Sequence, residues 1–173
     1  DYDNDGDLDM AVGDSGQNDL YINNGGSFTP TDQFGMNTTI ALAWGDADND
    51  GDLDLAVGNG ILGTDQQNLL YENLGDGNFQ ELERFGLGQT ATLAWGDFDQ
   101  DGDLALAVGN GGDGAQQQNS LYINMGGLMF AQRNEFGMGD TTAVAWGDAD
   151  NDGDLDLAVA NWNDGQNQLY INN

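Results

Sequence analysis

The sequence predicts an all-β fold made of tandem units of four antiparallel strands, about three and a half units in 173 residues. Three observations support this prediction. One acidic stretch recurs four times, short runs of alternating polar and apolar residues flank it, and no segment has a long helical period. Glycine is frequent, at 28 residues, as expected when many turns connect short strands. Residues 1–173 therefore form one repeat array.

Landmark residues define the length of the unit. Three tryptophans recur every 51 residues, and three Phe-Gly pairs have the same spacing: Trp44, Trp95 and Trp146, and the pairs beginning at Phe34, Phe85 and Phe136. A period near 50 lies in the range of propeller blades and solenoid units. The predicted units are residues 1–37, 38–88, 89–139 and 140–173, of which the first and last are incomplete.

Each unit is expected to contain four short strands. The first is represented by TTIALAWGD, with Ile40, Leu42 and Trp44 on one face and the small residues Ala41 and Ala43 on the other. The second strand reads LDLAVG, and the third is NDLYINN, NLLYENL, NSLYINM or NQLYINN. The fourth follows a glycine-rich turn and ends at Phe-Gly. The recurring tryptophans, which share the apolar face of the first strand, are predicted to be largely buried between sheets.

The acidic stretches lie between the first and second strands. We name them loops I to IV: residues 1–9, 46–54, 97–105 and 148–156. They hold 19 of the 31 acidic residues, while Arg84 and Arg133 are the two basic ones and the net charge is −29. Two carboxylates about 4 Å apart repel by about 4 kcal/mol at an effective dielectric near 20, so each cluster needs a cation. Oxygen donors without His or Cys favour a hard cation, Ca²⁺ before Mg²⁺.

The loops read D-x-D-x-D-G-x-x-D, and their carboxylates are the candidate calcium ligands. Glycine at position 6 permits the sharp turn that such a loop requires. An EF-hand is excluded because its position 12 is a glutamate between helices, whereas here it is a valine in an apolar run. Loop III has Ala105 at position 9, so three strong sites and a weaker fourth site at Asp97–Asp103 are predicted. Side chains at positions 1, 3, 5 and 9 and the backbone carbonyl at position 7 give this ligand set: Asp1, Asp3, Asp5, Asp7, Asp9; Asp46, Asp48, Asp50, Asp52, Asp54; Asp97, Asp99, Asp101, Asp103; Asp148, Asp150, Asp152, Asp154, Asp156.

With these loops placed between AWG and LAV, and with the recurring Phe-Gly, the chain resembles the FG-GAP/VCBS repeats. These are the blades of integrin-α-type β-propellers and of many secreted bacterial proteins. The resemblance implies propeller-type blades, calcium bound by the loop aspartates, and an extracellular, secreted or cell-surface location. The chain starts on a ligand and stops after a third strand, while closed propellers need four to eight blades. We therefore expect self-association or neighbouring blades of a longer chain.

The amino-acid composition excludes several classes of partner and of enzyme. The negative charge disfavours nucleic acid and anionic membranes as partners, and no apolar run is long enough to insert into a membrane. Without His, Cys or Lys, triads, Schiff bases and zinc sites are excluded, and among common enzyme classes a carboxylate-pair glycosidase is left. We expect no enzyme. Salt adaptation is a competing explanation for part of the charge.

Two functional classes stay open. One is an extracellular protein with a structural or assembly role, rigidified by calcium. The other is an adhesion or lectin-like segment of a larger secreted protein, with its glycan or protein ligand held by the variable loops between the second and third strands. Trp162 in the last of these loops is a candidate ligand contact, or else packs on a neighbouring blade. Asn37 begins the sequon Asn-Thr-Thr in an expected inter-strand loop and is a candidate glycosylation site.

Overall fold

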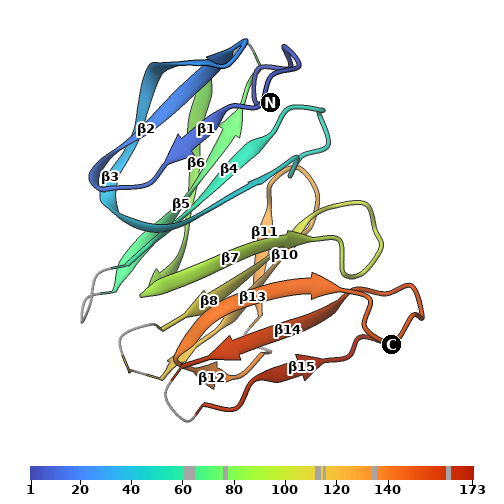
Figure 1. Ribbon diagram of the computed structural model, residues 1–173. Helices are drawn as coiled ribbons and strands as arrows, with labels where there is room; N and C mark the ends of the chain where they lie inside the picture. Colours follow the sequence, from blue (N-terminus) through green and yellow to red (C-terminus); the bar gives the residue numbers. More distant parts are fainter. Residues whose placement is uncertain (61–64, 76–77, 112–113, 115, 134–135, 163–164) are drawn as a thin grey trace.

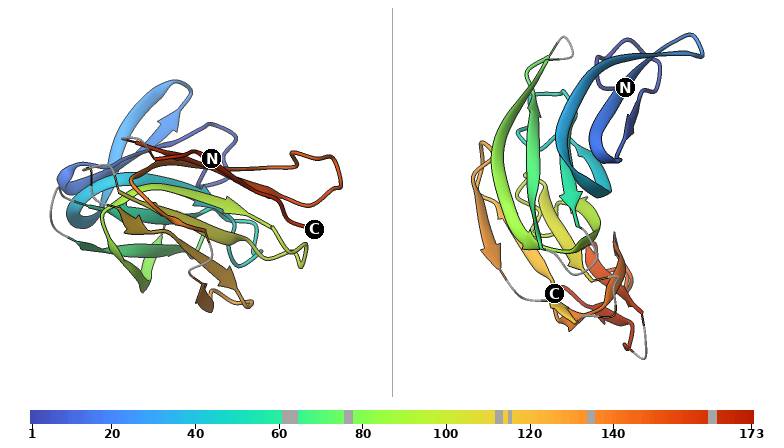
Figure 2. Two further views of the ribbon diagram at one scale, coloured as in Figure 1. Left: turned by 90° about the horizontal axis from the view of Figure 1, so that it is seen from below. Right: turned by 90° about the vertical axis from the view of Figure 1, so that its left-hand side faces the viewer.

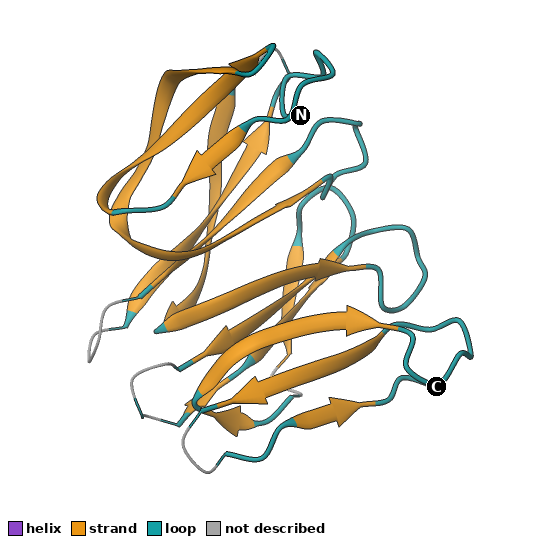
Figure 3. Ribbon diagram, in the orientation of Figure 1, coloured by secondary structure: helices purple, strands orange, loops and turns teal. Residues whose placement is uncertain are grey.

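A computed structural model describes residues 1–60, 65–75, 78–111, 114, 116–133, 136–162 and 165–173. Within these ranges the chain forms strands and turns, and no helix there could cross a membrane (Figures 1 and 3). The all-β prediction is confirmed. The strands are β1 (Met10–Val12), β2 (Ser15–Asn24), β3 (Ser27–Gly45), β4 (Asp54–Asn59), β5 (Gln66–Asn73), β6 (Phe79–Gly88), β7 (Thr90–Gly96), β8 (Ala105–Asn110), β9 (Gln117–Gln118), β10 (Ser120–Asn124), β11 (Phe130–Arg133), β12 (Met138–Gly139), β13 (Thr141–Gly147), β14 (Asp156–Asn161) and β15 (Gln168–Tyr170).

The strands pair into antiparallel sheets in the predicted order. We name four blades: blade I is β1, β2 and residues 27–38 of β3, and blade II is residues 39–45 of β3 with β4, β5 and β6. Blade III is β7, β8, β10 and β11, and blade IV is β13, β14 and β15. Blades I and II form one six-stranded sheet because β3 is continuous, pairing first with β2 and then with β4. The sequence predicted two separate strands there.

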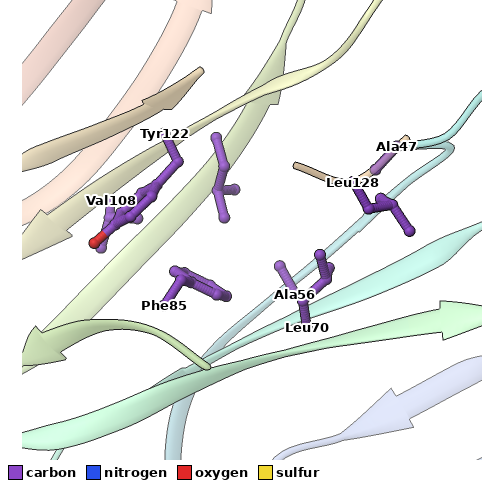
Figure 4. Close-up of a cluster of buried hydrophobic side chains, with 8 residues drawn as sticks. Ala47, Ala56, Leu70, Phe85, Val108, Tyr122 and Leu128 are labelled. Carbon is purple, nitrogen blue, oxygen red and sulfur yellow. The ribbon is translucent and has the colours of Figure 1, made fainter. Parts of the chain in front are cut away.

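Adjacent blades are held together by three equivalent apolar clusters, and the blades follow one another along the molecule (Figure 2). In each cluster, the second strand of one blade packs on the preceding blade. The cluster between blades II and III shows the pattern, with Ala56, Leu70 and Phe85 facing Val108 and Tyr122 (Figure 4). Leu20 and Phe34 with Leu55 and Val57, and Leu121 and Phe136 with Leu157 and Val159, repeat it at the other two joints.

The Phe-Gly pairs lie at these joints. The three phenylalanines are buried, and the three glycines adopt φ near +60°, a left-handed conformation that side chains disfavour. A Cβ at Gly86 would approach the Tyr122 hydroxyl of the next blade to 2.9 Å. The glycine carbonyl is also fixed, since Gln67 Nε2 donates to Gly86 O at 2.7 Å. Glycine is thus required for both its backbone conformation and its close contact with the next blade.

A buried polar relay also crosses each joint. Asn68 Nδ2 donates to Thr90 Oγ1 at 2.8 Å, and that hydroxyl donates to Asn110 Oδ1 at 3.0 Å. The relay is repeated as Asn18–Thr39–Asn59 and as Asn119–Thr141–Asn161. Because buried polar groups are costly when unpaired, each relay favours one alignment of the neighbouring blades.

Two expectations about the first strand need correction. The register shifts between Thr39 and Ala41, so a bulge lies at Ile40. The Ile40 side chain is 56 % exposed, whereas Leu42 packs partly buried against the apolar cluster. The tryptophans are half-buried instead of largely buried. Their indoles lie at the blade joints, where Trp95 Nε1 donates to Ala43 O at 3.1 Å in the preceding blade.

Candidate metal centres

The four acidic loops lie along one side of the molecule (Figures 1 and 3). Loops II to IV each connect the first and second strands of a blade, and loop I leads directly into β1. Two residues in each loop adopt positive φ, as the tight turn requires: the amide at position 4 and the glycine at position 6. In loop II these are Asn49, with φ 64°, and Gly51, with φ 98°. The turn brings alternate aspartates to the inside of the loop.

Hydrogen bonds from the backbone orient the inner carboxylates. The N–H at position 6 donates to the carboxylate at position 1, as in Gly51 N to Asp46 Oδ2 at 3.2 Å. The N–H at position 7 donates to the carboxylate at position 5, as in Asp52 N to Asp50 Oδ1 at 2.9 Å. The first contact recurs in all four loops, and so does the second.

The predicted ligands at positions 1, 3 and 5 converge in three loops. Their oxygens lie within 4.8 Å of one another in the triads Asp1–Asp3–Asp5, Asp46–Asp48–Asp50 and Asp97–Asp99–Asp101. In loop IV the equivalent triad is Asp148, Asp150 and Asp156, so the carboxylate at position 9 takes part there. An all-carboxylate set at this spacing is suited to a hard cation.

One oxygen of the first aspartate indicates that these triads fit an ion. Oδ1 of Asp1, Asp46 and Asp97 is buried and has no hydrogen-bond partner. A buried carboxylate oxygen without a partner is unfavourable, and a cation inside the triad would satisfy it. Burial also raises the pKa of the Asp48 carboxyl, and the charges of Asp50 and Asp46 raise it further. The triads are therefore sites where positive charge would be stabilising.

The aspartates at position 9 have a role that the sequence did not reveal. Asp54 is fully buried, its Oδ2 accepts Ala47 N at 2.9 Å, and its Oδ1 accepts Asn73 N at 2.9 Å. The carboxylate thus clamps the start of the loop to the third strand. Asp9 and Asp156 make the same pair of contacts, and Ala105 cannot. The pKa of Asp54 is raised to about 6, mainly by burial and further by the charges of Asp48 and Asp50, although the two N–H groups act to lower it.

In loops II to IV the carboxylate at position 7 accepts a hydrogen bond from the amide at position 4 of the preceding loop. Asn49 Nδ2, at position 4 of loop II, donates to Asp103 Oδ1 of loop III at 2.8 Å. Asn4 makes this contact with Asp52, and Gln100 makes it with Asp154. The feature of the sequence that could have indicated these contacts is the amide side chain at position 4 of every loop. That the position-7 backbone carbonyls bind metal stays a prediction, as does metal binding by the individual aspartates.

Two further candidate residues lie away from the loops. Asn37 lies inside β3, contrary to the inter-strand loop expected for it, and lines a groove of about 660 Å³ with Gln17, Gln66 and Gln67. Trp162 follows β14 and is largely exposed, and it does not pack on another blade among the described residues. The variable loops expected to carry a ligand include residues 61–64, 112–113, 115 and 163–164, which lie outside the described residues.

Comparison with known families agrees with this geometry. The model of the FG-GAP-like repeat matches residues 1–57, 60–108 and 97–159, which together span most of the chain and contain all four acidic loops. A comparison with curated proteins gives no match. The matched segments include the Phe-Gly pairs and the aspartate triads described above. The chain belongs to the family of FG-GAP-like repeats.

Proposed function

We propose that this chain is an extracellular calcium-binding repeat protein with a structural, non-catalytic role in an assembly. The observation that carries the proposal is the buried, unpaired Oδ1 of the first aspartate in loops I to III, at the corner of a carboxylate triad. The loops are preshaped by backbone hydrogen bonds, so their acids converge although they repel one another. Bound calcium would supply the positive charge that this arrangement lacks.

The loop residues have two roles, to bind the ion and to hold the loop in place against its neighbours. The carboxylates at positions 1, 3 and 5 would hold the ion, with the position-7 carbonyl and the position-9 carboxylate completing the shell. The position-9 clamp fixes the loop to the third strand, and the position-4 amide fixes it to the next loop. Calcium is favoured over magnesium because six to eight oxygens from a flexible loop suit the larger ion.

The chemistry of the loops and the family support an extracellular location. The chain has no cysteine, so no disulfide connects the blades, and ions in the loops would provide the rigidity instead. Extracellular calcium sites operate at millimolar concentrations, at which a loop with four or five carboxylates should be filled. At a calcium concentration 100 times the Kd, binding at one site stabilises the folded state by about 2.7 kcal/mol. Repeats of this family are common in secreted and surface proteins.

Thermal unfolding with and without calcium tests the proposal. We expect a higher melting temperature in millimolar calcium than in chelator, and a smaller gain in magnesium. The variant Asp48→Asn should lose part of the calcium gain because it removes one ligand of loop II, whereas Asp65→Asn should keep it because Asp65 is an exposed acid outside the loops. Equal melting temperatures with and without calcium would contradict the proposal.

A second candidate function is carbohydrate or protein binding by an adhesion or lectin-like segment. It is favoured by the exposure of Trp162, whose indole is free to stack on a sugar ring, and by the amide-lined groove beside Asn37. A glycan array with the wild-type protein and Trp162→Ala would test it. Binding that is lost in the variant supports this function, and an array without any bound glycan rejects a lectin role.

A further inference from the structure

Successive acidic loops are hydrogen-bonded to each other at the three blade joints, and we propose that calcium binding in one loop strengthens calcium binding in its neighbours. The inference rests on the calcium role proposed above and adds how the four sites act together. Two kinds of link join neighbouring loops. One is formed by the amide at position 4, and the other by an asparagine at the end of the third strand.

The first link begins between two candidate ligands. Asn49 lies between Asp48 and Asp50 of loop II. Its Nδ2 donates to Asp103 Oδ1 at 2.8 Å and to Gly102 O at 3.0 Å, both in loop III. When Asp48 and Asp50 hold an ion, the backbone between them is restrained. The Asn49 amide is then kept in position for its contacts with loop III.

The receiving aspartate is part of the next site. The carbonyl of Asp103 is the predicted position-7 ligand of loop III, and its N–H donates to Asp101 Oδ1 at 2.9 Å. Asp101 belongs to the carboxylate triad of that loop. A contact that holds the Asp103 side chain therefore also orders a triad carboxylate. Loops III and IV have the same link, because Gln100 donates to Gly153 O at 3.0 Å and to Asp154.

The second link is buried and begins at position 2. Tyr2 lies between Asp1 and Asp3, and its carbonyl accepts Asn73 Nδ2 of blade II at 2.8 Å. The N–H of Asn73 is held by Asp54, the position-9 residue of loop II. These contacts connect positions 1 and 3 of one loop to position 9 of the next. Because the link is buried, its hydrogen bonds are stronger than they would be in water.

The second link is complete at two joints and incomplete at the third. Between loops III and IV, Asn172 is the equivalent asparagine, and Asp156 holds its N–H. Between loops II and III, Asn124 Nδ2 donates to Ala47 O at 2.6 Å, but Ala105 has no carboxylate to hold the N–H of Asn124. Coupling should therefore be stronger between loops I and II than between loops II and III.

The sign of the coupling follows from the ordering of the loops. The first ion orders its own loop, and the links order part of the next loop at the same time. A second ion then binds a loop that is already partly ordered, which gives positive cooperativity. The charge of the first ion acts in the opposite direction because it repels a second cation, and salt weakens this repulsion. Since coupling is reciprocal, an empty loop weakens both of its neighbours.

Nuclear magnetic resonance can follow each loop separately while calcium is added to the metal-free protein in about 0.15 M salt. The reporters are the position-6 glycine N–H groups, which donate to the position-1 carboxylates: Gly6, Gly51, Gly102 and Gly153. Wild-type curves should be steeper than the curve of a single site, whereas repulsion between bound cations alone would make them shallower. The double variant Asp48→Asn with Asp50→Asn removes two ligands of loop II. It should raise the calcium midpoint about tenfold at Gly6 and about fivefold at Gly102.

Asn49→Gly separates the contact from the charge. It removes the first link between loops II and III, keeps every charge, and tolerates the left-handed φ of 64° at this position. In this background, the double variant should no longer shift the midpoint of Gly102, whereas it should still shift that of Gly6. Gln80→Ala, which removes an exposed amide from β6, should leave both responses as they are without it.

The remaining outcomes would overturn the proposal. These are wild-type curves no steeper than that of a single site, unchanged midpoints at Gly6 and Gly102 in the double variant, or a shift of Gly102 that persists with Asn49→Gly. Well-dispersed spectra in chelator should confirm that the variants fold. The titration also separates the two ideas. Glycine signals that do not respond to calcium reject the calcium role, whereas loops that bind calcium independently reject the coupling alone.

Discussion

Replacing Asp54 with alanine tests how loop II is built. The Asp54 carboxylate is fully buried and accepts two backbone N–H groups, from Ala47 and from Asn73. Both donors belong to fully buried residues, so the substitution leaves two buried N–H groups without this acceptor. Asp54→Ala therefore removes the clamp between the loop and the third strand, together with a candidate calcium ligand.

The expected cost follows from these contacts. A buried donor left unpaired costs about 1–3 kcal/mol, so two donors give about 2–6 kcal/mol. In the metal-free protein part of this loss is offset, because burial raises the pKa of Asp54 to about 6 and the charge itself is unfavourable there. We therefore expect about 2 kcal/mol without calcium. A chain of this length should then melt about 4–8 °C lower.

Thermal unfolding in chelator and in calcium separates the two roles of Asp54. We expect a loss of stability in chelator from the clamp, and a larger loss in calcium because a ligand is also missing. Asp54→Asn should be intermediate, since one amide oxygen can still accept an N–H. Asp65→Ala, an exposed change of the same charge, should melt as wild type does. A variant as stable as wild type in chelator would refute the clamp, and an unchanged calcium gain would refute the ligand role.

Three further predictions concern other parts of the array. Ala105→Asp should raise the calcium affinity of loop III about tenfold, or 1.4 kcal/mol, by restoring a position-9 carboxylate; unchanged affinities in a calcium titration would contradict this. Thr90→Val should destabilise the protein by about 2–4 kcal/mol in urea unfolding, because it removes the hydrogen bonds of Thr90 to both Asn68 and Asn110. The control Thr142→Val, at an exposed position, should be nearly neutral. Trp95→Ala should lower the free energy of unfolding by about 3 kcal/mol, which is the low end for a large aromatic because the indole is half-buried. A loss below about 1 kcal/mol would show that the indole does not stabilise the joint between the blades.

Local patterns in the sequence were sufficient to predict most of the strands and the acidic loops, although not the continuity of β3 through Asn37. Period-two alternation and the D-x-D-x-D-G turn are properties of neighbouring residues, so the all-β fold and the convergence of positions 1, 3 and 5 could be predicted. The triad of loop IV differs by including Asp156. Which aspartates of a nine-residue loop meet depends on small rotations of side chains that spacing alone does not specify.

The contacts between repeats could not be predicted from one unit. The partner of Asn49 is Asp103, and the partner of Trp95 Nε1 is the carbonyl of Ala43, about one repeat away in each case. The bulge at Ile40 likewise depends on the register with β4, which the alternation of β3 does not reveal. These features arise from packing between units, and a pattern that is read within a unit contains no information on them.

The continuous strand β3 has a consequence for how such a protein could be divided or lengthened. Domains joined by linkers can be separated by proteases at the linker, but residues 27–45 are paired first with one blade and then with the next. A cut between residues 37 and 38 would sever a paired strand and damage both blades. A deletion or duplication of 51 residues that begins and ends at equivalent positions of two acidic loops would instead leave every strand whole. Recombination between copies of the repeat could in this way change the number of blades in a single step.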